Sequence, residues 1–165
     1  DYFRQIGKPF KEILKSIGIK KNYNKIENTY KIASIKNIDK IKYYKGALKT
    51  LKKLRSNNID LCIVTSKDQH RTKKILKKNI KLFKYIECDD GKLKGKPNPD
   101  KIYNIINKTN YNKRDILFVG DTYIDYLTAK NSNIDFMYIK DGYGKNFNYK
   151  NKSKNISDLQ KKLLN

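Results

Sequence analysis

The apolar residues of this chain follow two alternating patterns from about residue 47 onward. Short unbroken apolar runs are typical of parallel strands buried on both faces, whereas apolar residues at every third or fourth position are typical of helices. Strands are predicted at 61–65, 84–88, 116–119 and 136–139, and helices at 47–56, 68–78, 99–108 and 124–130. A capping-box pattern from Ser157 to Gln160 predicts a last helix, and the Asn- and Lys-rich stretch 145–155 is predicted to be a loose loop.

This alternation predicts an α/β fold, a three-layer Rossmann-like sandwich with a mainly parallel sheet. The first forty residues differ, because they are polar and their apolar residues have helical spacing, with Gly18 as a predicted helix end. We therefore divide the chain into a helical segment, 1–42, and an α/β segment, 43–165.

Two carboxylates lie directly after the predicted strand 116–119. Asp121 follows Gly120, and Asp125 comes four residues later at the start of the next helix. Ligands of open parallel sheets bind at the carboxyl ends of the strands, and Mg²⁺ prefers carboxylate oxygens. The pattern indicates a metal site, although an N-cap and a first-turn acidic residue explain the same two positions without a metal.

Two further segments carry chemistry that suits a phosphate group. The strand 61–65 ends on the hydroxyls of Thr65 and Ser66 at a helix start, where free backbone N–H groups bind anions. Lys96 stands just ahead of a turn that contains two prolines. Hydroxyls, a lysine and carboxylates together are what phosphoryl transfer needs, since its catalysis is mainly positioning and charge stabilisation.

The order and spacing of these segments resembles the haloacid dehalogenase-like (HAD) hydrolase superfamily, and within it the phosphoglycolate phosphatase and β-phosphoglucomutase group. Residues 96–99 match the lysine motif of that group and residues 119–125 its acidic motif. Residues 141–144 resemble its Gly-Tyr-Gly segment, and residues 4–9 resemble its cap loop. The resemblance implies that 1–42 is part of a small helical cap and 43–165 the catalytic core.

The resemblance also implies a role for each site residue. Asp121 is expected to bind Mg²⁺, and Asp125 to support the metal shell through water or a hydrogen bond. Catalytic roles are expected for Thr65, which would hydrogen-bond the phosphoryl group, and for Lys96, which would neutralise its charge. The expected substrate-binding residues are Thr65, Ser66, Gly120, which gives the backbone room at the strand end, and Arg4 and Lys8 on the cap loop. Lys67 and Lys94 are weaker candidates, and His70 is expected on an exposed helix face.

One part of the family pattern is missing from these residues. Members of the group open with an apolar strand that ends in Asp-x-Asp and supplies the nucleophile, whereas this chain starts at Asp1 with no such strand. In the family fold that strand lies between the strands here predicted at 61–65 and 116–119, so both would lose a neighbour and expose an edge. We expect the 165 residues to be a fragment, poorly stable and inactive alone, of a full-length enzyme.

The function implied for that enzyme is hydrolysis of a small phosphorylated metabolite through an aspartyl-phosphate, with Mg²⁺ as cofactor. Phosphomutase activity and the identity of the ester stay open, as does the oligomeric state. An alternative from another class is a non-catalytic HAD-like domain that binds nucleic acid or another partner.

Composition bears on that alternative. The formal net charge is +23 and the isoelectric point about 9.9, values that suit a nucleic-acid partner. Lysines nevertheless dominate and are spread along the chain, as in proteins of AT-rich genomes, while nucleic-acid readers favour arginine. Nucleic acid is therefore disfavoured as a partner. Cys62 and Cys88 are expected to be free buried thiols, and with no membrane-spanning run the protein is expected to be cytoplasmic.

Overall fold

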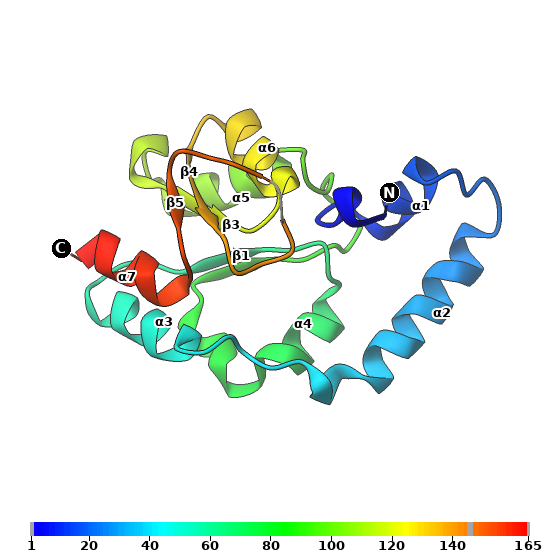
Figure 1. The fold of residues 1–165 in the computed structure, drawn as a ribbon, viewed down its shortest axis with the longest axis horizontal. Helices are drawn as coiled ribbons and strands as arrows, with labels where there is room; N and C mark the ends of the chain where they lie inside the picture. Colours follow the sequence, from blue (N-terminus) through cyan, green and yellow to red (C-terminus); the bar gives the residue numbers. More distant parts are fainter. Residues whose placement is uncertain (1, 145–146, 165) are drawn as a thin grey trace.

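The computed structural model describes residues 2–144 and 147–164, which form a mixed α/β fold (Figure 1). The helices in this part of the chain are α1 (Phe10–Ser16), α2 (Tyr23–Lys36), α3 (Ala47–Ser56), α4 (Gln69–Leu76), α5 (Asp100–Thr109), α6 (Tyr123–Ser132) and α7 (Ile156–Leu164). The strands are β1 (Cys62–Val64), β2 (Tyr85–Glu87), β3 (Leu117–Gly120), β4 (Asp135–Ile139) and β5 (Lys152–Ser153). The described residues also form four short 3-10 helices: η1 (Tyr2–Gln5), η2 (Ile38–Lys40), η3 (Lys77–Leu82) and η4 (Lys113–Asp115).

The strands form two separate parallel sheets. β1 pairs with β2, with Ile63 opposite Ile86, and β3 pairs with β4, which pairs in turn with β5. Among the described residues no ladder joins β1 to β3, so each of these strands has one neighbour. This agrees with the expectation that the strand between them is absent from these residues.

Helices cover the two faces of the sheets, which gives the three-layer arrangement that the sequence predicts. α5 contacts β1 and β2, and α6 contacts β3 and β4, on one side. α3, α4 and α7 lie on the other side, and α1 and α2 extend away from the sheets (Figure 1). The predicted helix at residues 47–56 matches α3, and the other predicted elements of the core agree with the structure to within a few residues.

The core is most densely packed around β4. Phe136 and Tyr138 form a buried cluster with Ala129 of α6, and partly buried Phe147 and Tyr149 pack against it. The prediction of a loose loop at 145–155 is therefore wrong for the part that the structure describes. Aromatic side chains hold that part against the sheet, and it contains β5.

Two other predictions need correction. α7 begins at Ile156, one residue before Ser157, and the carboxamide oxygen of Asn155 accepts a hydrogen bond from the Asp158 N–H at 2.9 Å. The capping side chain is therefore that of Asn155. Cys62 is exposed rather than buried, because it opens a strand that has one neighbour, and Cys88 is partly buried; both thiols are free.

Candidate active site

The two carboxylates after β3 have different environments at the start of α6. Asp125 is 5% exposed, and its Oδ2 accepts hydrogen bonds from the Thr122 hydroxyl at 2.7 Å and the Thr122 N–H at 3.1 Å. Thr122 caps the helix in return, which forms a capping box. Asp121 is partly buried, and its Oδ2 accepts a hydrogen bond from the Tyr143 N–H at 2.8 Å. Asp125 is thus fixed in the helix start, and Asp121 is held by the loop after β4.

Glycines leave the space that both carboxylates occupy. A Cβ atom on Gly120 would lie 2.3 Å from the Cβ of Asp125, and one on Gly142 would lie 2.1 Å from Oδ2 of Asp121. A Cβ on Gly144 would lie 2.1 Å from the Asp121 carbonyl oxygen. Such distances are far below van der Waals contact. A side chain at Gly120 or Gly142 would displace a carboxylate, and one at Gly144 would displace the Asp121 backbone.

Lys96 is joined directly to this helix start. Its Nζ donates to Oδ1 of Asp125 at 2.6 Å, and the two side chains are only 11% and 6% exposed. The turn around Lys96 is closed by the Asn98 N–H, which donates to the Gly95 carbonyl at 3.0 Å. The structure therefore brings together Lys96, Asp121 and Asp125, which the sequence separates by up to 29 positions.

The turn after β1 presents a hydroxyl donor. The Thr65 N–H bonds to the Glu87 carbonyl at 2.9 Å, continuing the ladder with β2. The Lys67 N–H donates to the Thr65 hydroxyl oxygen at 3.1 Å, so that hydroxyl keeps its own proton to donate. The Ser66 hydroxyl instead donates to the Gly7 carbonyl at 2.5 Å.

The cap loop reaches the same region from the amino-terminal segment. Besides its bond to Ser66, Gly7 lies against Thr122 and Ile124, since a Cβ atom on it would be 3.1 Å from atoms of both side chains. Gly95 lies closer still to Pro9, since a Cβ atom on it would be 2.2 Å from the Pro9 Cγ. Lys8 is therefore placed between residues that touch the site, while Arg4 is exposed on η1.

The ends of β1 and β3 lie close together, because Gly7 contacts Ser66 after β1 and Thr122 after β3. Desolvation of its ammonium group lowers the pKa of Lys67, and the charges of Arg71 and Lys96 add to this while Asp121 opposes it. Burial raises the pKa of the Tyr44 phenol, and the neighbouring charges of Tyr143, Asp121 and Asp141 contribute to the shift. Lys67 is thus within the field of both Lys96 and Asp121, which makes the region a cationic turn that faces a carboxylate.

Comparison with known proteins decides the family. The sequence profile of the haloacid dehalogenase-like hydrolases matches residues 1–139. The chain belongs to this family. It is also 28% identical to phosphoglycolate phosphatase 1 of Pseudomonas aeruginosa, over 61% of this chain and 38% of that protein. The chain thus spans well under half the length of that curated relative.

Solved structures agree on the fold. A candidate phosphoglycolate phosphatase from Lactobacillus plantarum superposes with a TM-score of 0.86 at 21% identity, over 96% of this chain and 79% of that one. A hydrolase from Pseudomonas syringae gives 0.84 at 22% identity, over 98% and 80%. Protein Tyrosine Kinase A of Mycobacterium tuberculosis gives 0.79 at 19% identity, over 99% and 80%. One fold serves several activities here, so function has to come from the site.

The carboxylates at the strand end differ in how well they suit Mg²⁺. Within residues 2–144 and 147–164 no three His, Cys, Asp or Glu side chains cluster as a ready metal cage. Mg²⁺ commonly takes only one or two protein carboxylates and keeps several waters. Asp121 suits that need, because it stands partly exposed at the strand end. Asp125 fits less well, because Lys96 and Thr122 already take its two oxygens.

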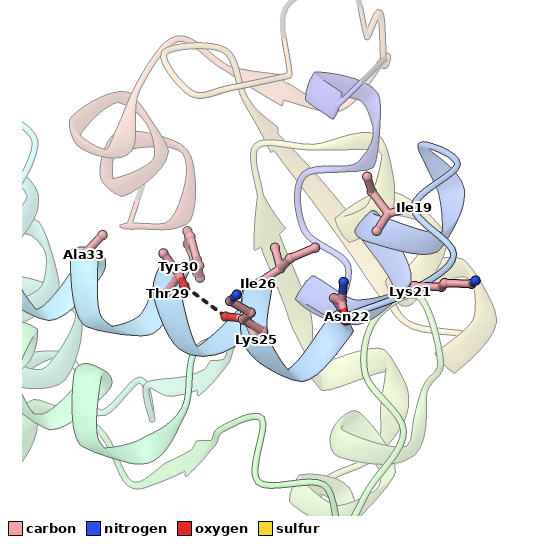
Figure 2. Close-up of a pocket in the computed structure, with 8 residues that line it drawn as sticks. All are labelled: Ile19, Lys21, Asn22, Lys25, Ile26, Thr29, Tyr30 and Ala33. Atoms are coloured by element: carbon pink, nitrogen blue, oxygen red, sulfur yellow. Dashed lines mark hydrogen bonds between the residues drawn. The ribbon is translucent and has the colours of Figure 1, made fainter.

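A hollow lies away from these strand ends, along α2 (Figure 2). It measures about 600 Å³ and is lined by apolar Ile19, Ile26, Tyr30 and Ala33, with lysines at its rim. α2 has no fully buried residue, and Ile32 is 66% exposed. No part of this hollow is formed by the strand-end residues. No helix in the described part of the chain is both long and apolar enough to cross a membrane.

Some residues of the site carry no signal in the sequence. Lys101 and Asp89 are brought to the Thr65 turn by tertiary packing alone. Arg71, in the first turn of α4, lies close to Lys67 along the chain. His70 is exposed on α4, as predicted. Of the weaker candidates, Lys67 lies at the site, whereas the described contact of Lys94 is to Asp100 through its backbone N–H.

Proposed function

We propose that the protein containing this chain is a Mg²⁺-dependent phosphomonoester hydrolase that acts on a small phosphorylated metabolite in the cytoplasm. The observation that carries the proposal is the buried Lys96–Asp125 pair at 2.6 Å, in the same helix start as Asp121. Gly7 contacts both this helix start and Ser66, next to Thr65. A cation fixed by a buried carboxylate keeps its charge and position without substrate. Such preorganised charge is the main source of catalysis in phosphoryl transfer.

Each residue has a defined task in this proposal. The Thr65 hydroxyl and the Ser66 backbone N–H donate hydrogen bonds to the transferring phosphoryl oxygens, and Lys96 neutralises their charge. Asp121 would hold Mg²⁺, which supplies charge neutralisation between phosphate and nucleophile. Asp125 acts through Lys96 and the helix cap. Arg4 and Lys8, on the cap loop, contact the leaving group.

The nucleophile is proposed to be an aspartate on a strand outside these 165 residues. Support comes from the unpaired edges of β1 and β3, and from their burial, since neither strand has a fully buried residue while β4 has three. A carboxylate oxygen of that aspartate attacks phosphorus, and the P–O bond to the leaving alcohol breaks. Water then hydrolyses the aspartyl-phosphate to inorganic phosphate and regenerates the carboxylate. These 165 residues alone are proposed to be inactive.

The test is phosphate release by the full-length protein from phosphoglycolate, sugar phosphates and p-nitrophenyl phosphate. We expect turnover that needs Mg²⁺ and stops with a chelator, and none from residues 1–165 alone. Asp121→Asn should lower kcat/KM at least about 100-fold, the scale for loss of one electrostatic group. Asp135→Asn is the matched control, because Asp135 is exposed at the opposite end of the sheet, and it should leave the rate within about twofold.

Absence of Mg²⁺-dependent release from every ester would overturn the proposal. The net charge of +23 then favours the second candidate, a non-catalytic domain that binds nucleic acid. That function requires an affinity that falls steeply as the salt concentration rises, because released counterions drive such binding.

A further inference from the structure

Lys101 is a lysine whose burial stands out in this highly basic chain. It is only 1% exposed, although lysine is almost never fully buried unless its charge is paired. It lies in the first turn of α5, outside the predicted motif residues, and α5 contacts both β1 and β2.

The Lys101 ammonium group reaches the turn that follows β1. Its Nζ donates to the Thr65 carbonyl oxygen at 3.4 Å and to Oδ1 of Asp89 at 3.2 Å. The Asp89 N–H donates to the Lys67 carbonyl at 2.9 Å, and the Lys67 N–H donates to the Thr65 hydroxyl oxygen. These bonds form a network around residues 65–67, in which Lys101 binds both the Thr65 carbonyl and the Asp89 carboxylate.

Through its backbone, Lys101 is also joined to the Lys96 turn. α5 starts four residues after Lys96, and the Asp100 N–H donates to the Asn98 side chain at 3.1 Å, so the path from Lys96 to Lys101 is short and ordered. One end of this path carries the cation that faces the phosphate site, and the other end holds the Thr65 carbonyl. The two segments proposed to contact phosphate are therefore linked through Lys101.

A purely structural ion pair explains these contacts less well. Burying a lysine–carboxylate pair is a poor way to gain stability, because desolvation offsets most of the attraction. The same helix carries a pair that is structural in this sense. Lys108 binds Oε1 of Glu87 at 2.8 Å, with its side chain 43% exposed. Glu87 contacts Thr65 through its backbone carbonyl, and the described side-chain bonds of this pair do not reach residues 65–67.

We propose that Lys101 is a positioning residue, which holds the Thr65–Lys67 turn in the geometry that binds the phosphoryl group. Its charge also offsets Asp89, whose carboxylate would otherwise repel an anion nearby. The inference rests on the proposed phosphatase activity and deepens it, because it adds a residue that acts on substrate only through Thr65.

The experiment compares Lys101→Met, Lys101→Arg and Lys108→Met in the full-length protein. We measure kcat, KM and the inhibition constant of inorganic phosphate, together with amide hydrogen exchange of Lys67. Lys101→Met should lower kcat/KM about 10- to 100-fold, as for groups that orient a ligand. It should also weaken inhibition by phosphate and speed exchange of the Lys67 amide. Lys101→Arg keeps the charge and should restore most of the rate, and Lys108→Met should match the wild type.

A folded Lys101→Met protein with unchanged phosphate inhibition and Lys67 exchange overturns the inference. If that variant does not fold, Asp89→Asn decides, since it removes the partner charge but keeps an acceptor. The readout is then exchange of the Lys67 amide, because removing the Asp89 charge by itself favours phosphate binding. Faster exchange supports the role of Lys101, and unchanged exchange contradicts it. If the wild type releases no phosphate, the proposed function fails separately, and exchange of the Lys67 amide still tests Lys101.

Discussion

The two sheets of the core differ in what holds them to their helices. β4 buries Phe136, Met137 and Tyr138, whereas no residue of β1 or β2 is fully buried. Aromatic rings fill the space around β4, with Phe136 in contact with the rings of Tyr126 and Phe147 among others. The three-stranded sheet is therefore stabilised mainly by apolar burial.

Charged side chains take a larger part around β1 and β2. Lys101 pairs with Asp89 just after β2, and Lys108 pairs with Glu87 in β2 itself. Near the opposite end, Asp60 precedes β1 and binds Lys84, which precedes β2. A protein rich in lysine can thus build one half of a sheet layer on apolar packing and support the other half with ion pairs. The two halves should respond to different perturbations.

Removing an aromatic side chain from the apolar half should have the largest effect on stability. Phe136 is 3% exposed, so Phe136→Ala leaves a cavity and should lower the free energy of unfolding by about 3–5 kcal/mol. Ile86 in β2 is partly buried, and Ile86→Ala should cost roughly 1–2 kcal/mol. Urea denaturation of the full-length protein measures both values. Equal losses would show that the two sheets do not differ in apolar burial.

A substitution at Gly142 tests whether the loop after β4 positions the Asp121 carboxylate. Gly142→Ala would place a Cβ 2.1 Å from the Asp121 carboxylate, so the carboxylate must move. We expect kcat/KM, or the affinity for Mg²⁺, to fall about 10- to 100-fold, as when a group that orients a metal ligand is lost. Steady-state kinetics over a range of Mg²⁺ concentrations measures this.

Gly18→Ala is the control for backbone strain in that experiment. Gly18 has a positive φ, of 87°, which Gly142 lacks, and nothing lies within 4 Å of the added Cβ. That variant should lose a little stability and no activity. If both variants keep full activity, the loop after β4 does not position Asp121.

Local signals in the sequence explain why most of the core elements could be predicted. α3, β3 and β4 have the strong period or the unbroken apolar run that defines their type. β5 could not be predicted, because Lys152 and Ser153 carry no apolar pattern. Its pairing depends on Tyr138, whose N–H donates to the Asn151 carbonyl at 3.0 Å. The aromatic contacts of Phe147 likewise come from tertiary packing.

In the candidate site, too, some residues have a local signal in the sequence and others are brought in by tertiary packing. Thr65 and Asp121 follow strands directly, so their place at one edge of the sheet could be expected from topology, and Lys96 followed from its resemblance to a family motif. The engagement of Ser66 with Gly7 could not be expected, because it joins residues 59 positions apart. Nothing in the sequence distinguishes Lys101 from the many solvated lysines, and its burial is evident only in the fold. Long-range contacts of this kind have no local signal.

The smallest expected effect concerns the ion pairs of the charged half. Hydrogen bonds from Lys84 and Tyr111, with a further one from Arg55, lower the pKa of Asp60 from 3.8 to about 2. A carboxyl whose pKa is depressed in the folded state contributes stability above its unfolded pKa. That contribution should be complete above about pH 4 and should disappear as the pH falls to about 2.

Asp60→Asn measures this contribution by comparison. The mutant should unfold more readily than the wild type at pH 5 and converge with it near pH 2, with a modest difference because surface ion pairs are weak. Added salt should shrink the difference at pH 5, since exposed charges are screened. Asp115→Asn, at an exposed carboxyl outside the β1–β2 pair, should show no such convergence. If the free energies of unfolding of Asp60→Asn and the wild type differ by the same amount at every pH, the ion pairs of Asp60 with Lys84 and Arg55 do not stabilise the fold. Other contacts then hold this end of the β1–β2 sheet.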